Sequence, residues 1–336
     1  MLFTLDKIIN LFIFLFSLIS NILGLSLFHH FKVSGKINTA NWLIFIQCSS
    51  DIVFSVSSFL FHSEIATINK YVVFYLINFE SVDLHFTVSF LFVYIFLIIA
   101  FFNPCIVATM LYTRYKTITN SGVSEKIGMK KVVKILLANT VFIIIAMFSL
   151  MYNGFEIDGD PQILYKFDQV NNYTDTYVNE NSRAILFNLT SIKYMISIAS
   201  LVIYITIMLG IIMTYLIKYR AFMTKNLIYM SEMTRMLNND FFKILLLQTI
   251  SPILFLFGPF SVAIISILLQ IPTRNLITYI FISGSCVPLS NALFLLIFLR
   301  KSRDIMKNRF KRLVNSILCK TNQNIFLALT THTKKD

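Results

Sequence analysis

The sequence is poor in the residues that build soluble surfaces and tight turns. Only 13% of its 336 residues are charged, and it holds nine glycines and six prolines. A typical soluble chain is about a quarter charged, because ions cover its surface. Hydrophobic residues make up 57%, with 34 phenylalanines and a mean hydropathy of +0.74. No single core of this length would hide so much apolar surface, so the composition excludes a soluble globular protein.

Cysteine is also scarce, and its placement excludes several kinds of site. The four cysteines are isolated and lack metal-ligand spacing: Cys48, Cys105, Cys286 and Cys319. The long polar stretch from Tyr152 to Ser191 contains none, so no disulfide is expected there. Phosphate-binding glycine loops, histidine arrays and nucleophile elbows are missing as well. We therefore expect no enzyme, no cofactor and no metal site.

Seven apolar runs are long enough to cross a bilayer, which takes roughly 20 residues. They are Ile8–Phe31, Trp42–Phe61, Phe86–Tyr112, Val132–Met151, Ile192–Ile217, Phe241–Leu269 and Leu276–Leu299. We predict an all-α integral membrane protein, with a seven-transmembrane helix bundle over residues 1–299 and a cytoplasmic tail over residues 300–336. A further apolar stretch, Tyr71–Phe79, fits a loop, an interfacial segment or part of a longer second helix.

Lys and Arg residues are divided unequally between the two sides of this bundle. With the N-terminus outside the cytoplasm, 23 of the 29 lie in cytoplasmic segments. The positive-inside rule therefore predicts an outer N-terminus and a cytoplasmic C-terminus. Because the basic charge follows this topology, it gives no reason to expect nucleic-acid binding. The long polar stretch from Tyr152 to Ser191, which this topology places outside, carries two glycosylation sequons, at Asn172 and Asn188.

A basic segment with helical periodicity follows the last predicted span. Apolar residues recur at helical spacing between Ile305 and Leu318, and Lys and Arg residues fill the other face. A short amphipathic helix of this kind is expected to lie on the inner leaflet of the lipid bilayer. A solvated basic tail is the alternative. Cys319 at its end is a candidate for palmitoylation.

Asp51 is the one acidic residue well inside a predicted span. Ionisable residues are costly in hydrocarbon, so each is a functional hypothesis by default. Asp51 is expected either to bind a cation or to join an interhelical network, with Asn21, Ser290 or Asn291 as its partner. We favour a structural or switching role over ligand binding.

Prolines interrupt three of the predicted spans. Pro104 lies in the third, Pro252 and Pro259 in the sixth, and Pro288 in the seventh. Each removes a backbone hydrogen bond and is expected to kink its helix. Pro252, Pro259 and Pro288 are candidate hinge residues, together with the intramembrane Gln248, although a kink also serves packing alone.

The outer ends of several spans combine phenylalanine-rich walls with a few polar side chains. Such a setting suits a small, mostly apolar ligand. Depth alone selects the candidate ligand-binding residues: Asp83, His85, Asn153, Tyr194, Tyr279 and Ser283.

Two groups of residues also carry a resemblance. They are Met230-Ser231-Glu232-Met233-Thr234 with Phe241-Phe242, Gln248, Pro252 and Pro259, and then Pro288 with Arg300-Lys301-Ser302-Arg303. Residues 230–310 thereby resemble the nematode serpentine chemoreceptor superfamily, in the branch that contains classes str, srd, srh, sri and srj. Leu111-Tyr112-Thr113-Arg114-Tyr115 is similar to the element that closes the family's third helix.

The resemblance implies a G-protein-coupled receptor in the plasma membrane of a sensory neuron, often on its cilium. Such a receptor detects a small odorant or pheromone and activates a heterotrimeric G protein. Arg114, Tyr115, Lys218 and Arg220 would then belong to the coupling surface. Two alternatives stay open: a ligand-gated channel of the seven-helix insect chemoreceptor type, and a small-solute transporter, although the chain shows no internal repeat. Its oligomeric state is equally open.

Overall fold

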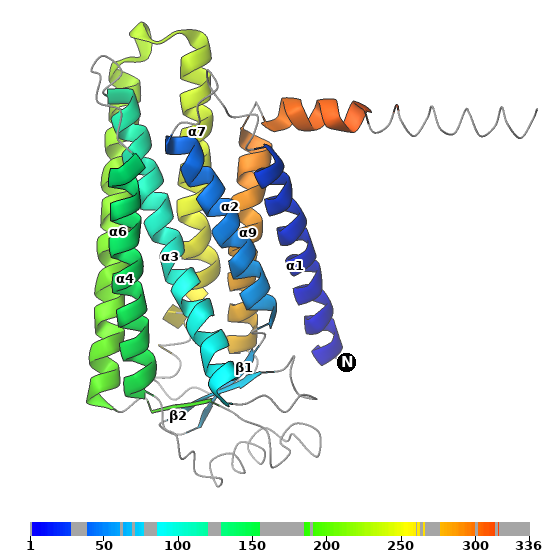
Figure 1. Ribbon diagram of the computed structural model, residues 1–336, viewed down its shortest axis with the longest axis vertical. Helices are drawn as coiled ribbons and strands as arrows, with labels where there is room; N and C mark the ends of the chain where they lie inside the picture. Colours follow the sequence, from blue (N-terminus) through cyan, green and yellow to red (C-terminus); the bar gives the residue numbers. More distant parts are fainter. Residues whose placement is uncertain are drawn as a thin grey trace, which may run out of the picture.

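The computed structural model describes residues 2–27, 39–60, 63–68, 71–76, 86–119, 129–154, 185–188, 191–259, 261–262, 265, 276–299, 302–312 and 315. Within these ranges the long helices stand side by side in a bundle (Figure 1). They are α1 (Leu2–Leu27), α2 (Thr39–Leu60), α3 (Phe86–Thr119), α4 (Met129–Gly154), α6 (Ile192–Lys225), α7 (Glu232–Pro252) and α9 (Leu276–Phe298). A 3-10 turn, η3 (Leu227–Tyr229), follows α6, and a π-helical turn, η4 (Ile253–Phe257), continues α7.

Each of the seven predicted spans overlaps one of these helices, although the sixth, Phe241–Leu269, shares only its first part with α7. Six described helices are long and apolar enough to cross a membrane on their own. The seventh candidate is the Ile282–Phe298 part of α9 taken with Ser302–Arg312, which bends away from it by 85°. The bent segment is helical, as predicted for the tail, and extends sideways from the bundle in Figure 1. The remaining apolar residues of the predicted stripe, up to Leu318, lie outside the described residues.

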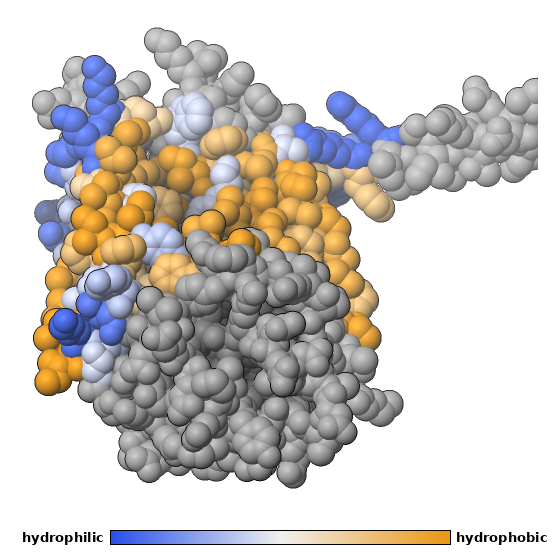
Figure 2. Space-filling view, turned by 60° about the horizontal axis from the view of Figure 1, so that its bottom comes forward, coloured by the Kyte–Doolittle hydropathy of each residue, from blue (hydrophilic) through white to orange (hydrophobic). Residues whose placement is uncertain are grey.

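The outer surface of the bundle is apolar, as a lipid-facing surface must be. Phe16 on α1, Ile145 on α4 and Ile217 on α6 are each 59–64% exposed. In Figure 2 hydrophobic residues dominate the described sides of the bundle. Hydrophilic residues gather near its ends and on the helix that extends away from it. Apolar side chains face both the core of the bundle and the lipid, so the hydrophobic effect does not fix the rotation of each helix about its axis. Contacts between polar residues must fix it instead.

The core of the bundle is centred on α3, which contacts α2, α4, α6 and α7. Every residue from Asn103 to Leu111 is buried. Helix α6 contributes a single buried stripe that repeats every three or four residues, as a helix packed on one side requires: Ser197, Leu201, Tyr204, Met208, Ile212, Leu216, Tyr219 and Met223.

Three short strands form an antiparallel sheet at the end of the bundle opposite the α6–α7 hairpin (Figure 1). They are β1 (Ser63–Ile68), β2 (Tyr71–Leu76) and β3 (Ile185–Asn188), in the order β1-β2-β3. Ser63 pairs with Leu76 and Tyr71 with Asn188. The stretch that begins at Tyr71 therefore opens with a strand, and its interpretation as part of a longer second helix is wrong. Its β-branched and aromatic residues favour strands.

Candidate functional site

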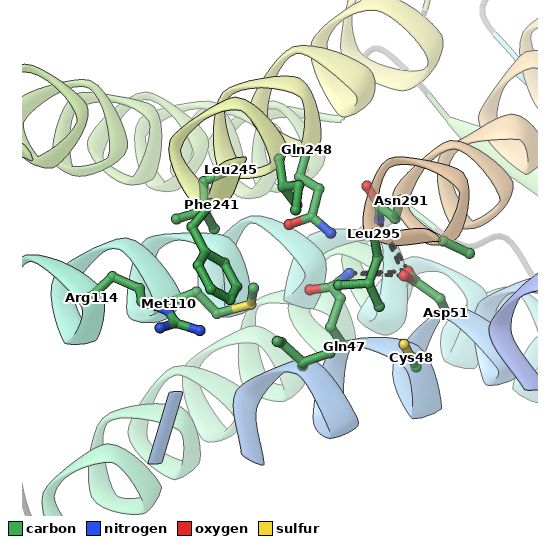
Figure 3. Close-up of a pocket in the computed structure, with 13 residues that line it drawn as sticks. Gln47, Cys48, Asp51, Met110, Arg114, Phe241, Leu245, Gln248, Asn291 and Leu295 are labelled. Atoms are coloured by element: carbon green, nitrogen blue, oxygen red, sulfur yellow. Dashed lines mark hydrogen bonds between the residues drawn. The ribbon is translucent and has the colours of Figure 1, made fainter. Parts of the chain in front are cut away.

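Three helices converge on the carboxylate of Asp51, which is 1% exposed in the middle of α2. Gln47, one turn earlier, donates its amide to both carboxylate oxygens at 3.1 and 3.0 Å. Asn291 of α9 donates to both oxygens at 3.3 Å (Figure 3). Asn103 of α3 donates to one of them at 3.0 Å. Of the three predicted partners, Asn291 contacts Asp51 directly.

The polar network continues from Asp51 towards α1. The Ser55 hydroxyl donates to the Asp51 backbone carbonyl at 2.7 Å and lies 2.6 Å from the Ser17 hydroxyl. Asn21 donates to the carbonyl of Pro288 at 3.2 Å, which joins α1 to α9 beside the proline. Directional bonds of this kind fix the relative height and rotation of helices that hydrophobicity alone would leave free.

A small cavity of about 20 Å³ lies beside this network, with Gln47, Asp51, Asn291 and Gln248 among its lining residues. The amide oxygens of Gln47, Gln248 and Asn291 are buried and have no hydrogen-bond partner among the described residues. A polar cavity of this size has room for about one water molecule. The described residues hold no group of three or more His, Cys, Asp or Glu side chains placed to bind a metal ion.

Arg114 lies at the opposite end of the same cavity, where α3 approaches α7 (Figure 3). Its guanidinium carbon is 3.6 Å from the centre of the Phe241 ring, a close cation–π contact. Its Nη2 atom is buried without a hydrogen-bond partner in the described part of the chain. Phe241 of α7 therefore covers the charged group of α3 on the side where the sequence predicts coupling.

The other predicted coupling residues fall into two groups. Arg220 of α6 lies 5.5 Å from the Phe242 ring and lines a 440 Å³ cavity between α6 and α7. Arg235 of α7 lines the same cavity. Lys218 lies 5.8 Å from the ring of Tyr215, and the Tyr115 ring lies 5.9 Å from it, so these two gather around a different residue of α6.

The predicted hinge coincides with a break in regular helical geometry. Helix α7 begins at a cap, where the Ser231 side chain accepts from the Thr234 backbone N–H at 3.3 Å. After Pro252 the chain makes a π-helical turn, closed by the Gly258 N–H donating to the Ile253 carbonyl. Single π turns inside α-helices are often found at functional sites. Pro259 follows this turn, and Gln248 is buried one turn before Pro252.

The structure ties two of the outer candidates, Asn153 and Ser283, to neighbouring helices. Asn153 donates to the hydroxyls of Ser149 and Ser197, each at 3.1 Å, and so joins α4 to α6. Ser283 of α9 donates to the Phe255 carbonyl in the π turn at 2.7 Å. Tyr194 is partly buried in the first turn of α6.

The remaining predicted residues are not tested by these contacts. Asp83, His85, Asn172 and Cys319 lie outside the described residues, and for Tyr279 and Asn188 only the backbone is described. Cys48, Cys105 and Cys286 are free thiols, as expected from their isolation.

Sequence reasoning missed three residues of this site. Gln47 is four residues before Asp51, so helical spacing alone could have identified it as a neighbour. Asn103 and Phe241 reach Asp51 and Arg114 from other helices. No local signal in the sequence indicates such cross-helix contacts.

Comparison with known proteins gives a family and a fold. The profile of the serpentine type 7TM GPCR chemoreceptor Str family matches residues 6–307. No curated protein matches the chain significantly. Among solved structures, the chain is similar to squid rhodopsin, with a TM-score of 0.63 at 13% sequence identity, over 92% of this chain and 85% of that one. At this identity the likeness concerns the fold alone.

Proposed function

Because the chain belongs to the Str family of serpentine seven-transmembrane chemoreceptors, we propose that it detects a small environmental molecule and activates a heterotrimeric G protein. The contact between Arg114 and Phe241 carries this proposal. It places a covered cation at the end of the bundle where α6 and α7 project beyond the other helices (Figure 1). A receptor that exposes such a group on activation gains a binding surface for a partner.

The proposal includes the orientation of the chain. The end of the bundle that carries Arg114 and the α6–α7 hairpin is cytoplasmic, and the sheet β1-β2-β3 lies outside. The 23 Lys and Arg residues assigned to cytoplasmic segments support this orientation. The receptor is placed in the plasma membrane of a sensory neuron, in its ciliary membrane, where an odorant or pheromone arrives from outside.

Coupling requires α7 to move its cytoplasmic half away from α3. Pro252 and the π turn Ile253–Phe257 supply the point of bending, because backbone hydrogen bonding is interrupted there. The movement would separate Phe241 from Arg114 and widen the cavity lined by Arg220 and Arg235. A basic, partly apolar crevice of this kind fits an amphipathic helix of a Gα subunit.

Ligand binding is proposed at the outer end of the bundle. The site would lie between the Asn153 cluster, which is Asn153 with Ser149 and Ser197, and the contact of Ser283 with the π turn. Ser283 bonds directly to the turn that forms the hinge. A ligand that disturbs this hydrogen bond would therefore act directly on the turn about which α7 bends. Asp51 and its amide partners then hold α2, α3 and α9 together while α7 moves.

The test needs no ligand. Nucleotide-sensitive energy transfer is measured between a donor on the C-terminus and a tagged Gα, in cells that display the receptor. We expect a signal on nucleotide depletion that collapses when GTP is added. Arg114→Ala should abolish it while surface display is unchanged, because the covered cation is lost.

Lys193→Ala is the matched control, since it removes an exposed cation from the other end of the bundle. An unchanged signal in Arg114→Ala would contradict the proposed role of that residue. A ligand-evoked current that survives block of G proteins would favour the channel alternative.

A further inference from the structure

We propose that the groove between α3, α4 and α6 binds one anionic phospholipid of the cytoplasmic leaflet. An acyl chain would occupy the cavity in the groove, and the phosphate would lie against Lys131 and Lys218. The proposal rests on the orientation given under the proposed function, because it requires both lysines at the cytoplasmic interface. The groove lies on the lipid-facing surface of the bundle and is separate from the crevice between α6 and α7.

The groove contains a cavity of about 220 Å³. Its floor is buried and mostly apolar, with Cys105 and Ala108 from α3 and Met208 from α6. Its mouth is half-exposed on the surface of the bundle, between Ile135 of α4 and Tyr215 of α6. For scale, an engineered apolar cavity of about 150 Å³ is large enough to bind benzene. The groove therefore has room for a hydrocarbon segment that enters from the bilayer.

A polar side chain stands at the mouth, within the span of α4. Asn139 donates one N–H to the Ile135 carbonyl at 2.9 Å and is half-exposed. A primary amide carries two N–H donors and one acceptor, so it can make further hydrogen bonds. Because a polar residue facing hydrocarbon is costly, it calls for a partner of its own. The ester carbonyls of a phospholipid are acceptors inside the membrane that suit this amide.

The charged end of the groove lies nearer the cytoplasm. Lys218 is 5.8 Å from the ring of Tyr215, and Lys131 also acts on Tyr215 electrostatically, from α4. Both lysines are exposed, and no described carboxylate pairs with either. Lys131 precedes Asn139 by eight residues, or about 12 Å along the helix. Lys131 therefore lies nearer the charged end of the groove than the amide at its mouth.

Tyrosines fill the space between the cations and the apolar floor. The Tyr112 ring lies edge-on to Tyr215 at 5.4 Å, and the Tyr115 ring lies 5.9 Å from it. Tyrosine is enriched at headgroup depth in membrane proteins. From its floor towards the cytoplasm, the groove thus presents apolar, amide, aromatic and cationic groups. The acyl chain, the ester groups and the phosphate of a phospholipid follow one another in the same direction. Because no described carboxylate pairs with either lysine, the two cations favour a headgroup of net negative charge over a zwitterionic one, whose charges cancel.

The test is native mass spectrometry of the full-length receptor, released from micelles that contain phosphatidylserine and phosphatidylcholine with identical acyl chains. We expect phosphatidylserine to be retained in preference to phosphatidylcholine. Lys131→Gln and Lys218→Gln should each weaken retention about fivefold, since a Lys near an anionic surface contributes on the order of 1 kcal/mol. The matched controls are the single changes Lys225→Gln and Lys243→Gln, each of which removes the same charge elsewhere and should leave retention unchanged.

Two further variants test the site without depending on charge removal. Lys131→Arg with Lys218→Arg keeps the charge and should keep retention, whereas Ala108→Phe fills the floor and should lower the retention of both lipids. Equal retention of the two lipids, or equal loss in the two controls, would overturn the proposal. The assay contains no G protein, so failed coupling with selective lipid retention counts against the proposed function alone. Intact coupling with unselective retention counts against the groove alone.

Discussion

The two sides of the bundle are held together by different chemistry. On the side of α1, α2, α3 and α9, the contacts include a buried carboxylate, amides and hydroxyls, centred on Asp51 and Asn291. On the side of α4 and α6, the contacts along the helices are apolar stripes and aromatic pairs such as Phe142 with Tyr204, at 5.2 Å. Polar contacts on this side are fewer and involve uncharged groups, such as the Asn153 cluster and the Tyr94 hydroxyl of α3, which donates to the Ile144 carbonyl of α4 at 2.9 Å.

This difference indicates which helices are free to move. Hydrogen bonds between helices are directional, so a displacement of about 1 Å breaks them, whereas apolar side chains can slide and repack. Helix α7 adjoins both sides. It contacts α3 through a cation–π pair and apolar side chains, and it carries the π turn that lets it bend. Substitutions in each region should therefore differ in kind as well as in size.

The largest effect is expected at Asp51. Asp51→Ala leaves the amide donors of Gln47, Asn103 and Asn291 without their acceptor in a buried site. The free energy of unfolding should fall by about 3 kcal/mol, because each buried unsatisfied group costs on the order of 1 kcal/mol or more. Thermal unfolding of the purified receptor, followed by a dye that reacts with its buried thiols, measures this loss. Ser50→Ala, the preceding residue, serves as the control, and equal losses would contradict the special role of Asp51.

Gly258→Ala should have the next largest effect. A methyl group at this position would lie 2.9 Å from the Ile253 carbonyl that closes the π turn. Crowding against backbone costs about 2 kcal/mol, and we expect the unfolding temperature to fall. Gly210→Ala is the matched control, because nothing lies within 4 Å of the added group. That change should stabilise α6 slightly, and a loss as large as that of Gly258→Ala would refute the π-turn explanation.

Phe241→Leu should act on the switch more than on the fold. It removes an aromatic face that contributes about 1 kcal/mol to holding Arg114 covered. Ligand-independent coupling should rise about fivefold, since 1.4 kcal/mol corresponds to a factor of ten. The same energy-transfer assay measures it, with Phe148→Leu on the lipid-facing side of α4 as the control. Unchanged or reduced basal coupling would mean that Phe241 does not restrain α7.

The smallest effect is expected at Tyr204. Its hydroxyl is buried and has no hydrogen-bond partner among the described residues. Tyr204→Phe should therefore leave the unfolding temperature unchanged or raise it slightly. Tyr219 offers the contrast, because its hydroxyl donates to the Asn238 carbonyl at 3.2 Å. Tyr219→Phe should cost about 1 kcal/mol, and a larger loss in Tyr204→Phe would show that the Tyr204 hydroxyl also makes a stabilising hydrogen bond.

Much of the fold is predictable from the sequence, because an apolar run of about 20 residues has few options other than a membrane helix. The bundle and the bent basic helix follow from such runs and from the periodicity after Leu299. The sheet was not predicted. Two runs rich in β-branched and aromatic residues, separated by Asn69-Lys70, are a recognisable hairpin pattern. The apolar character of the second run is equally compatible with a loop, an interfacial segment or part of a longer second helix.

The candidate site is predictable only in part. Asp51, Gln248 and the prolines are conspicuous, because polar and helix-breaking residues are rare within membrane spans. Their partners depend on how each helix is rotated about its axis. A lipid-exposed helix can be as apolar outside as inside, so its hydrophobic pattern does not reveal the rotation. For that reason Asn291 could be named as a candidate, whereas the Phe241 ring over Arg114 could not.

The π turn also sets the register between the two halves of one long helix. A π turn holds one residue more than an α turn, and each residue of an α-helix is rotated by about 100° from the one before it. The extra residue is taken up within the wider turn, so deleting one residue between Ile253 and Phe257 would restore a regular helix and leave the following residues on nearly the same faces. The same deletion in the regular part of α7, between Phe241 and Gln248, would instead rotate one side of the helix by about 100° relative to the other. The π turn can thus absorb a change of a single residue in length without altering which side chains the helix presents on either side of it.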